Sequence, residues 1–222
     1  KVKTMVTKPI VLAMNLNLDP VVPPWVNISQ INAKSECQSI GAHLITEDEW
    51  LTIVRNIEMQ PTNWSSGQIG SGYIPRGNSD SDAAMDGTEP LTDIHKRTLT
   101  LSNGATIWDI AGNVFDWTDA TILGKDQPQG VANPTDFAYY QYSNLYSYGA
   151  LSPERLLPLN PAWNTNQGYG QIYTKGVLTD MATYAFYRSG YWIHGARAGV
   201  LALTLLRVPG DSINFIGFRC AR

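Results

Sequence analysis

The sequence predicts an α+β fold in a single domain that spans residues 1–222. Two patterns typical of helices lie within the first 60 residues, whereas patterns typical of short strands are concentrated from about residue 98 onward. Helices grouped early and strands grouped late favour an α+β class over an alternating α/β class. No internal repeat or linker divides the chain, and its length suits one large domain.

The composition argues against several classes of partner. Charged residues make up 16% of the chain, below the roughly 25% that is usual for soluble domains. The net charge of −3 gives no electrostatic reason to expect a nucleic-acid partner. No apolar run approaches the roughly 18 residues of a membrane-spanning helix, so we expect no membrane insertion. The first residues show no signal-peptide pattern, so none is expected.

The first 60 residues are expected to contain a strand and two helices. The strand is predicted over residues 10–16 and is followed by a passage rich in Pro. The first helix is predicted over residues 29–40, because Ser29 is a favoured N-cap and Gly41 a favoured stop. The second helix begins with a capping box, in which Thr46 is the N-cap and Glu49 follows three residues later. Helical spacing then predicts a buried face made of Trp50, Ile53, Val54 and Ile57.

Loops and short strands are predicted for the rest of the chain. Residues 61–90 are rich in Gly, Ser, Asn and Asp and lack periodicity, which is typical of a long surface loop. A hairpin is predicted over residues 98–108, with its turn at residues 102–104. Residues 119–185 carry few strong patterns. Near the end, two apolar runs over residues 200–206 and 213–218 are separated by a turn at residues 208–211.

The common catalytic and metal-binding motifs are absent from the sequence. Two cysteines are too few for a four-cysteine zinc or iron–sulfur site. His43, His95 and His194 lie far apart without metal-ligand spacing, so each is expected to be a surface or loop residue. The chain has neither a glycine-rich phosphate loop nor a Gly-x-Ser-x-Gly nucleophile elbow.

Three passages, in order along the chain, are similar to one branch of a known fold. They are CQSIGAHLITEDEW from Cys37, WDIAGNVFDW from Trp108, and the ending GFRC from Gly217. Together they resemble the formylglycine-generating (sulfatase-modifying) branch of the C-type lectin fold, and they span nearly the whole domain. The resemblance implies a C-type-lectin-like fold with two helices, small twisted antiparallel sheets and long loops.

The enzymes of this branch oxidise a substrate cysteine with a pair of thiols in the C-terminal core. The corresponding stretch here, residues 188–207, contains no cysteine, so we expect no catalysis. In the wider fold a helix cysteine and a last-strand cysteine commonly form a structural disulfide. The resemblance transfers this pairing to Cys37 and Cys220, and two buried free thiols are the alternative.

Calcium is the cofactor that the resemblance raises. Calcium-dependent lectins use an acid-or-amide–Pro–amide-or-acid loop and a Trp-Asn-Asp strand. Residues 89–91 (Glu-Pro-Leu) and 127–129 (Gln-Pro-Gln) match the loop only in half and Trp-Asn-Asp is absent, so this sugar site is not expected. The enzyme relatives hold a structural calcium near the positions of Asp109 and Asp116, whose oxygens suit calcium. An acid that caps a turn is the simpler alternative, and no cofactor is required by the expected function.

The C-terminal segment, residues 188–222, resembles a second family in its motifs. Its Arg-x-Gly-x-Trp-x-x-Gly-x-x-Ala-Gly frame and its Ile-Gly-Phe-Arg ending are similar to the variable region of diversity-generating retroelement proteins. In that family a reverse transcriptase copies a template and randomises its adenines, so Asn codons are replaced at fixed sites. The resemblance implies that those sites form one ligand-binding surface on the C-type lectin fold.

The residue types in this segment allow a test of that resemblance. Changing the adenines of AAC or AAT leaves the final pyrimidine intact, so the product cannot encode Lys, Glu, Gln, Met or Trp. From Ser189 to the end Lys, Glu, Gln and Met are absent, and the one Trp, Trp192, occupies a framework position. The same types are scattered through the rest of the chain, so the absence favours the resemblance, and chance in a short segment is the alternative.

Carried over position by position, the family's pattern gives twelve candidate variable sites, and every one holds a residue that an Asn codon can reach by adenine changes. They are Tyr191, Ile193, His194, Arg197, Thr204, Leu206, Arg207, Gly210, Asp211, Ile213, Asn214 and Phe215. Tyr and Arg are favoured at binding hot spots, although Leu206 and Ile213 suit a core equally well. The residues expected to form fixed scaffold are Gly195, Ala198, Gly199, Val200, Leu203 and Leu205.

These patterns predict a protein that binds a ligand or receptor through a diversified C-terminal surface. The expected partner is an unknown protein or glycan, and display on a virion or cell surface is expected over a cytoplasmic location. One alternative is a catalytically inactive or atypical relative of the formylglycine-generating enzymes. Another is a structural or adhesion module whose surface does not vary. No metal ligand set is predicted beyond the two aspartates.

Overall fold

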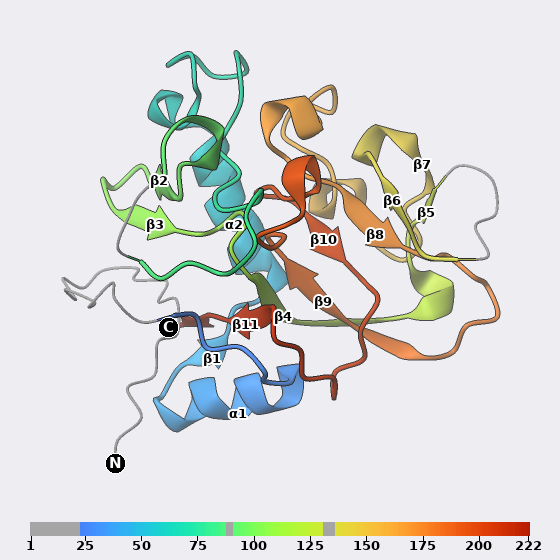
Figure 1. Cartoon of the computed structure of the whole chain (residues 1–222). Coiled ribbons are helices and arrows are strands. Elements are labelled where there is room, and N and C mark those ends of the chain that lie inside the picture. Colours follow the sequence, from blue (N-terminus) through green and yellow to red (C-terminus); the bar gives the residue numbers. More distant parts are fainter. Residues whose placement is uncertain (1–22, 88–90, 131–135) are drawn as a thin grey trace.

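The computed structural model of the protein describes residues 23–87, 91–130 and 136–222. The strand predicted over residues 10–16 lies outside the described residues, as does most of the half-matching Glu89-Pro90-Leu91 passage. The described part is a mixed α+β structure in which two helices flank a central sheet (Figure 1). Within that part, no helix combines the length and the apolar character that crossing a membrane requires.

Both predicted helices are confirmed, and local signals account for their ends. Helix α1 (Gln30–Ser39) begins after Ser29, whose side chain accepts a hydrogen bond from the amide of Asn32. Helix α2 (Glu47–Glu58) begins with a complete capping box formed by Thr46 and Glu49. The predicted apolar face of α2 is buried: Trp50, Ile53, Val54 and Ile57.

The central sheet has six strands and mixed directions. Their order is β11 (Ile216–Phe218), β4 (Phe115–Leu123), β9 (Thr183–Arg188), β10 (Leu203–Thr204), β8 (Ile172–Thr174) and β6 (Ala138–Tyr140). Strand β11 pairs parallel to β4, and β10 pairs parallel to β8, so the expectation of antiparallel pairing was wrong for these two pairs. Each of these pairs is joined by a long connection, which parallel pairing needs.

Three two-stranded sheets surround the central one. They are β1 (His43–Leu44) with β12 (Cys220–Ala221), β2 (Thr98–Thr100) with β3 (Thr106–Trp108), and β5 (Gln129–Gly130) with β7 (Leu145–Ser147). The β2–β3 pair is the predicted hairpin, with its strands in antiparallel register. The predicted turn at residues 208–211 is present too, because the amide of Asp211 donates to the carbonyl of Val208.

Two hydrophobic clusters occupy the two faces of the central sheet. Helix α1 packs on the β11–β4 end, where Trp117 and Phe218 belong to one cluster (Figure 1). Helix α2 packs on the other cluster, which includes Leu203 of β10. A disulfide joins Cys37 of α1 to Cys220 of β12, so of the two alternatives for these cysteines the structure has the bonded one.

The predicted long loop after α2 is irregular but closely attached to the fold. Apart from one 3-10 turn, residues 61–87 form neither helix nor strand. Two of its apolar side chains, Trp64 and Ile74, are buried, and the Trp64 indole donates to the carbonyl of Glu58. Sequence patterning missed the strands between residues 119 and 185, which are short and interrupted by turns.

Replacing either of two glycines in the C-terminal segment by alanine is expected to change the free energy of unfolding by very different amounts. A Cβ on Gly199 would lie 2.3 Å from the amide nitrogen of Gly170 and 2.4 Å from the carbonyl oxygen of Gly168, and backbone cannot move aside easily. A Cβ on Gly210 would meet no heavy atom within 4 Å. We expect Gly199→Ala to cost about 1–3 kcal/mol or more and Gly210→Ala to stay within about 0.5 kcal/mol. Urea unfolding of both variants measures this, and equal costs would contradict it.

Candidate ligand-binding surface

The backbone beneath the candidate positions is held by buried side chains from other elements. The indole of Trp50 donates to the carbonyl of Val200 over 3.0 Å. The carbonyl of Leu201 accepts from the hydroxyl of Tyr142 and, over 2.9 Å, from the guanidinium of Arg188. These donors come from α2, from the 142–144 turn and from β9, so three separate parts of the chain fix residues 200–201. The scaffold expected at Val200 is thus buried and anchored.

A buried ion pair links this scaffold to the start of α2. Arg188 donates to both carboxylate oxygens of Glu47, over 2.5 Å at its shortest contact, and both side chains are almost fully buried. Thr118 of β4 donates to the same carboxylate over 2.6 Å. Burial alone would favour the neutral guanidine, but the adjacent carboxylate raises the pKa of Arg188, so it stays charged. The pair ties β9, β4 and α2 together beneath the surface.

The loop after α2 braces the segment from the other side. The amide of Gly195 donates to the carbonyl of Ser79 over 2.7 Å, and the amide of Ser81 donates to the carbonyl of Trp192 over 2.7 Å. Asn78, which precedes these contacts, is buried. A loop region that the sequence predicted as surface therefore contributes backbone support to residues 192–195.

Four candidate positions lie on the loop between β9 and β10. The rings of Tyr191 and His194 lie 4.2 Å apart, between centroids, and both are half-buried. Ile193 is 58% exposed although its side chain is apolar. Arg197 is exposed. Two aromatic rings, an exposed aliphatic chain and a cation therefore lie within seven residues.

Phe215 brings the second candidate loop to the first. Its ring stacks on that of Tyr191, with centroids 4.5 Å apart and planes 18° apart. The buried ring of Phe115 lies beneath both, 5.4 Å from Tyr191 and 6.3 Å from Phe215. Two loops that are far apart in sequence thus meet over one aromatic residue of the sheet.

The other seven candidate positions differ widely in exposure. Gly210 and Asn214 are exposed, and Asp211 and Arg207 are half-buried. The remaining three pack against the sheet: Leu206 and Ile213 are half-buried against the α1-side cluster, and Thr204 of β10 is 5% exposed. The structure thus places His194 and Phe215 against Tyr191 and leaves Thr204 beneath the surface.

Two tyrosines outside the C-terminal segment join the candidate positions and were missed by sequence patterning. In the register of the sheet Tyr139 of β6 lies opposite Tyr173 of β8, and Tyr173 lies opposite Thr204. Cross-strand partners share a face, so all three side chains lie on one side. The hydroxyl of Tyr139 lies 3.2 Å from Nε2 of His194, and the guanidinium of Arg197 lies 4.2 Å from its ring centroid. A run of aromatic residues at 137–140 was the available signal, but its strand character was not evident.

We call this group the candidate surface: Tyr139, Tyr173, Tyr191, Ile193, His194, Arg197, Arg207 and Phe215. It combines aromatic ring faces, an aliphatic side chain and two guanidinium groups on half-buried or exposed residues. Such side chains offer large contact areas together with directional hydrogen bonds, which is typical of binding hot spots.

His194 is expected to remain neutral throughout the physiological pH range. Burial, with the charge of Arg197 added, lowers the pKa of His194 from 6.5 to about 4. The unfolded chain takes up this proton near pH 6.5, whereas the folded chain resists protonation until about pH 4. The contribution of His194 to the free energy of unfolding should therefore be fully present above pH 6.5 and be lost as the pH falls from 6.5 to 4. The contribution is at most about 3 kcal/mol. An NMR titration should give a pKa well below 6, and His194→Gln should weaken the acid dependence of stability; a pKa near 6.5 would contradict this.

The two aspartates considered for calcium each bind an arginine. Asp109 accepts two hydrogen bonds from Arg97, each over 2.7 Å, and Asp116 accepts two from Arg219, the shorter over 2.6 Å. The guanidinium groups supply the positive charge that a cation would otherwise bring. Within the described residues no group of three or more His, Cys, Asp or Glu side chains could hold a metal ion. A structural calcium stays a prediction, in competition with these ion pairs.

The two other histidines pair with acids instead. Nε2 of His43 lies 2.9 Å from Glu49, and Nε2 of His95 lies 3.7 Å from Asp80. His43 and His95 are both partly exposed, in agreement with the expectation of surface or loop residues.

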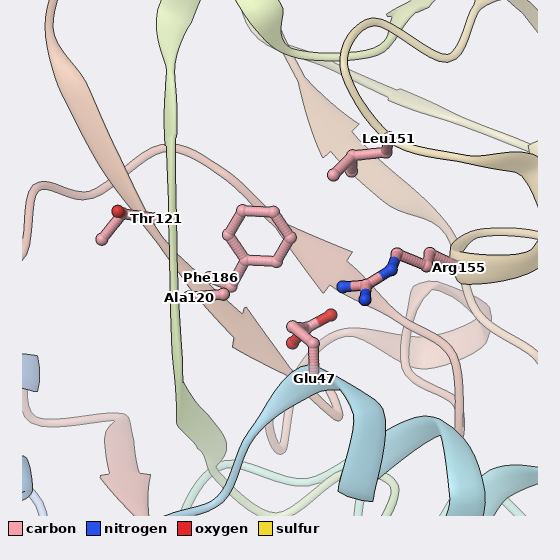
Figure 2. A pocket seen from close by; sticks show the side chains of 6 residues that line it. All are labelled: Glu47, Ala120, Thr121, Leu151, Arg155 and Phe186. Atoms are coloured by element: carbon pink, nitrogen blue, oxygen red, sulfur yellow. The ribbon is translucent and has the colours of Figure 1, made fainter.

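A small hollow in the described structure lies away from the candidate surface. It measures about 120 Å³ and is lined by Glu47, Ala120, Thr121, Leu151, Arg155 and Phe186 (Figure 2). Small-molecule sites usually measure roughly 300–1,000 Å³, so this one is small. Its polar groups already have partners, because Glu47 binds Arg188 and Arg155 binds Asp48. None of the twelve candidate positions lines it.

Comparison with known proteins gives little further guidance. No family model matches the chain, and no curated protein matches it. Among solved structures it is similar to a protein titled "Major Tropism Determinant P3c Variant", with a TM-score of 0.40 and 12% sequence identity. The match covers 86% of this chain and 36% of that one, so the chain spans little more than a third of that structure. These comparisons establish no family.

Proposed function

We propose that this protein binds a ligand or receptor through the candidate surface, that a retroelement diversifies this surface, and that the protein catalyses no reaction. One observation carries the proposal: candidate positions from two separate loops, residues 191–197 and 213–215, meet around the ring of Tyr191. The resemblance implies that these positions form one surface. The contacts of Tyr191 with His194 and Phe215 support that expectation.

The separation of surface from scaffold also supports the proposal. The fixed residues Ala198, Gly199, Val200 and Leu203 are buried, whereas Ile193, Arg197, Gly210 and Asn214 are exposed. A surface that must accept many side chains needs a backbone fixed by other residues. The hydrogen bonds to the carbonyls of Val200 and Leu201 provide that support.

The disulfide supports display outside a reducing compartment. Bonds such as Cys37–Cys220 persist in oxidising environments, including virion and cell surfaces. Both cysteines of the chain are used in this bond. No cysteine is left unbonded, so no free thiol supports the alternative relationship to the formylglycine-generating enzymes.

Two displayed libraries test the proposal. In both libraries, six codons are replaced by AAC with its two adenines randomised. The first library varies six candidate positions: Tyr191, Ile193, His194, Arg197, Asn214 and Phe215. The matched control varies six buried positions: Ala198, Gly199, Val200, Leu201, Leu203 and Leu205. We expect most clones of the first library and few of the second to resist thermolysin. Panning resistant clones of the first library against lysozyme should yield binders with dissociation constants near about 1 μM. Equal protease resistance of the two libraries, or no binders, would contradict the proposal.

A further inference from the structure

The arginines of this protein fall into two groups by their partners. All nine lie within the described residues. Six form ion pairs with Asp or Glu: Arg55, Arg76, Arg97, Arg155, Arg188 and Arg219. Arg222 donates to the carbonyl of Ile40. Arg197 and Arg207 form no ion pair with a carboxylate in the described part of the chain, and both belong to the candidate surface.

An aromatic side chain lies close to each of these two guanidinium groups. Arg197 lies over the ring of Tyr139, 4.2 Å from its centroid. Burial raises the pKa of the buried Tyr187 hydroxyl, and the charge of Arg207 close by opposes that rise. The Nε atom of Arg207 is inaccessible to solvent and has no hydrogen-bond acceptor within the described residues. A buried donor without an acceptor destabilises a fold, so this arginine is placed at a cost to stability.

None of the neighbouring titratable groups in the described structure forms an ion pair with these arginines. Tyr139 has its pKa raised by burial, so it stays protonated. His194 is neutral above its lowered pKa of about 4. The one acidic candidate position, Asp211, accepts a hydrogen bond from the amide of Val208 in the turn. The candidate surface therefore has an excess of positive charge on a chain whose net charge is −3.

We infer that the ligand of this chain is acidic, and that its carboxylate, sulfate or phosphate oxygens accept hydrogen bonds from Arg197 and Arg207. The inference rests on the proposed function and adds the chemical class of the ligand. A guanidinium group offers a planar set of donors that matches such oxygens and forms bonds stronger than neutral ones. The cation–π contact with Tyr139 holds Arg197 in place before the ligand arrives, which reduces the entropy lost on binding.

Arginine-selective NMR tests the inference with simple anions as probes. The Nε–Hε signals of the folded, disulfide-bonded protein are followed while sodium acetate, sodium sulfate or sodium phosphate replaces sodium chloride at constant ionic strength. We expect saturable shifts at Arg197 and Arg207, with dissociation constants of about 1–10 mM, for at least one of the three anions. The anion that binds most tightly identifies the acidic group. Arg155, which is exposed and paired with Asp48, is the internal control and should shift no more than in chloride.

Matched variants separate this inference from the proposed function. Arg197→Gln together with Arg207→Gln should abolish the saturable shifts of remaining surface signals such as the His194 ring, whereas Arg155→Gln should leave them unchanged. The inference would be overturned if raising the chloride concentration shifted the Arg197 and Arg207 signals as much as the probe anions do. It would also be overturned if the probe anions shifted the Arg155 signal as much as those of Arg197 and Arg207. If the display library still yields binders in that case, the acidic ligand is wrong and the binding function stands.

Discussion

Loss of the Cys37–Cys220 disulfide is expected to lower the free energy of unfolding by about 5 kcal/mol. The bond joins residues 183 positions apart, from α1 to β12. A cross-link of that span restricts the unfolded chain strongly, and the entropic stabilisation grows with the logarithm of the span. Globular domains have total stabilities of only about 5–15 kcal/mol, so this loss would be a large part of the whole. For this chain length it corresponds to a melting temperature lower by roughly 10–20 °C.

Calorimetry with and without a thiol reductant measures this effect. The double variant Cys37→Ser with Cys220→Ser is the control, because it should melt at the lower temperature and show no further response to reductant. Both cysteines are buried, so full reduction must be verified by thiol labelling after unfolding. A reduced protein that melts within about 2 °C of the oxidised one would contradict the expected stabilisation.

Removing the Arg188 guanidinium should be strongly destabilising. Arg188→Met leaves the buried Glu47 carboxylate without its counter-charge and the carbonyl of Leu201 without one of its donors. Breaking a buried pair from one side typically costs about 3–5 kcal/mol. The candidate surface should be disturbed as well, because Leu201 belongs to the backbone beneath it.

An exposed pair gives the matched control. Arg155→Met removes the partner of Asp48, and both of these side chains are largely exposed. Exposed pairs contribute about 0–1 kcal/mol, so this variant should unfold almost as the parent does in urea. Adding Glu47→Gln to Arg188→Met should recover part of the loss, since no buried charge is then left unpaired. Equal costs for Arg188→Met and Arg155→Met would show that the buried pair does not hold this part of the fold together.

Local sequence signals predicted the elements that local interactions define. The capping box at Thr46, the cap at Ser29 and the hairpin turn at residues 102–104 depend on neighbours within a few residues, and all three are present. The strands between residues 119 and 185 are short and pair with partners far along the chain. Their register depends on the whole sheet, so no local pattern marked them.

The candidate surface was predictable only where its residues lie in the C-terminal segment. The resemblance of the C-terminal segment marked Tyr191 and Phe215, and the structure stacks them. Tyr139 and Tyr173 lie outside the marked segment and reach the surface only through the pairing of β6 with β8 and β8 with β10. Nothing in the sequence indicated that Arg188 pairs with Glu47, because 141 residues separate them.

The central claim is that the candidate surface is diversified for binding, and the nucleotide sequence around the 3′ end of the gene tests it most directly. The account predicts a nearby near-copy of the codons for residues 188–222, beside a reverse-transcriptase gene. The two copies should differ only where the near-copy has adenine, and the affected codons should be those of the twelve candidate positions. Absence of both the copy and the reverse transcriptase, with one uniform sequence in every isolate, would contradict the claim and leave a fixed surface.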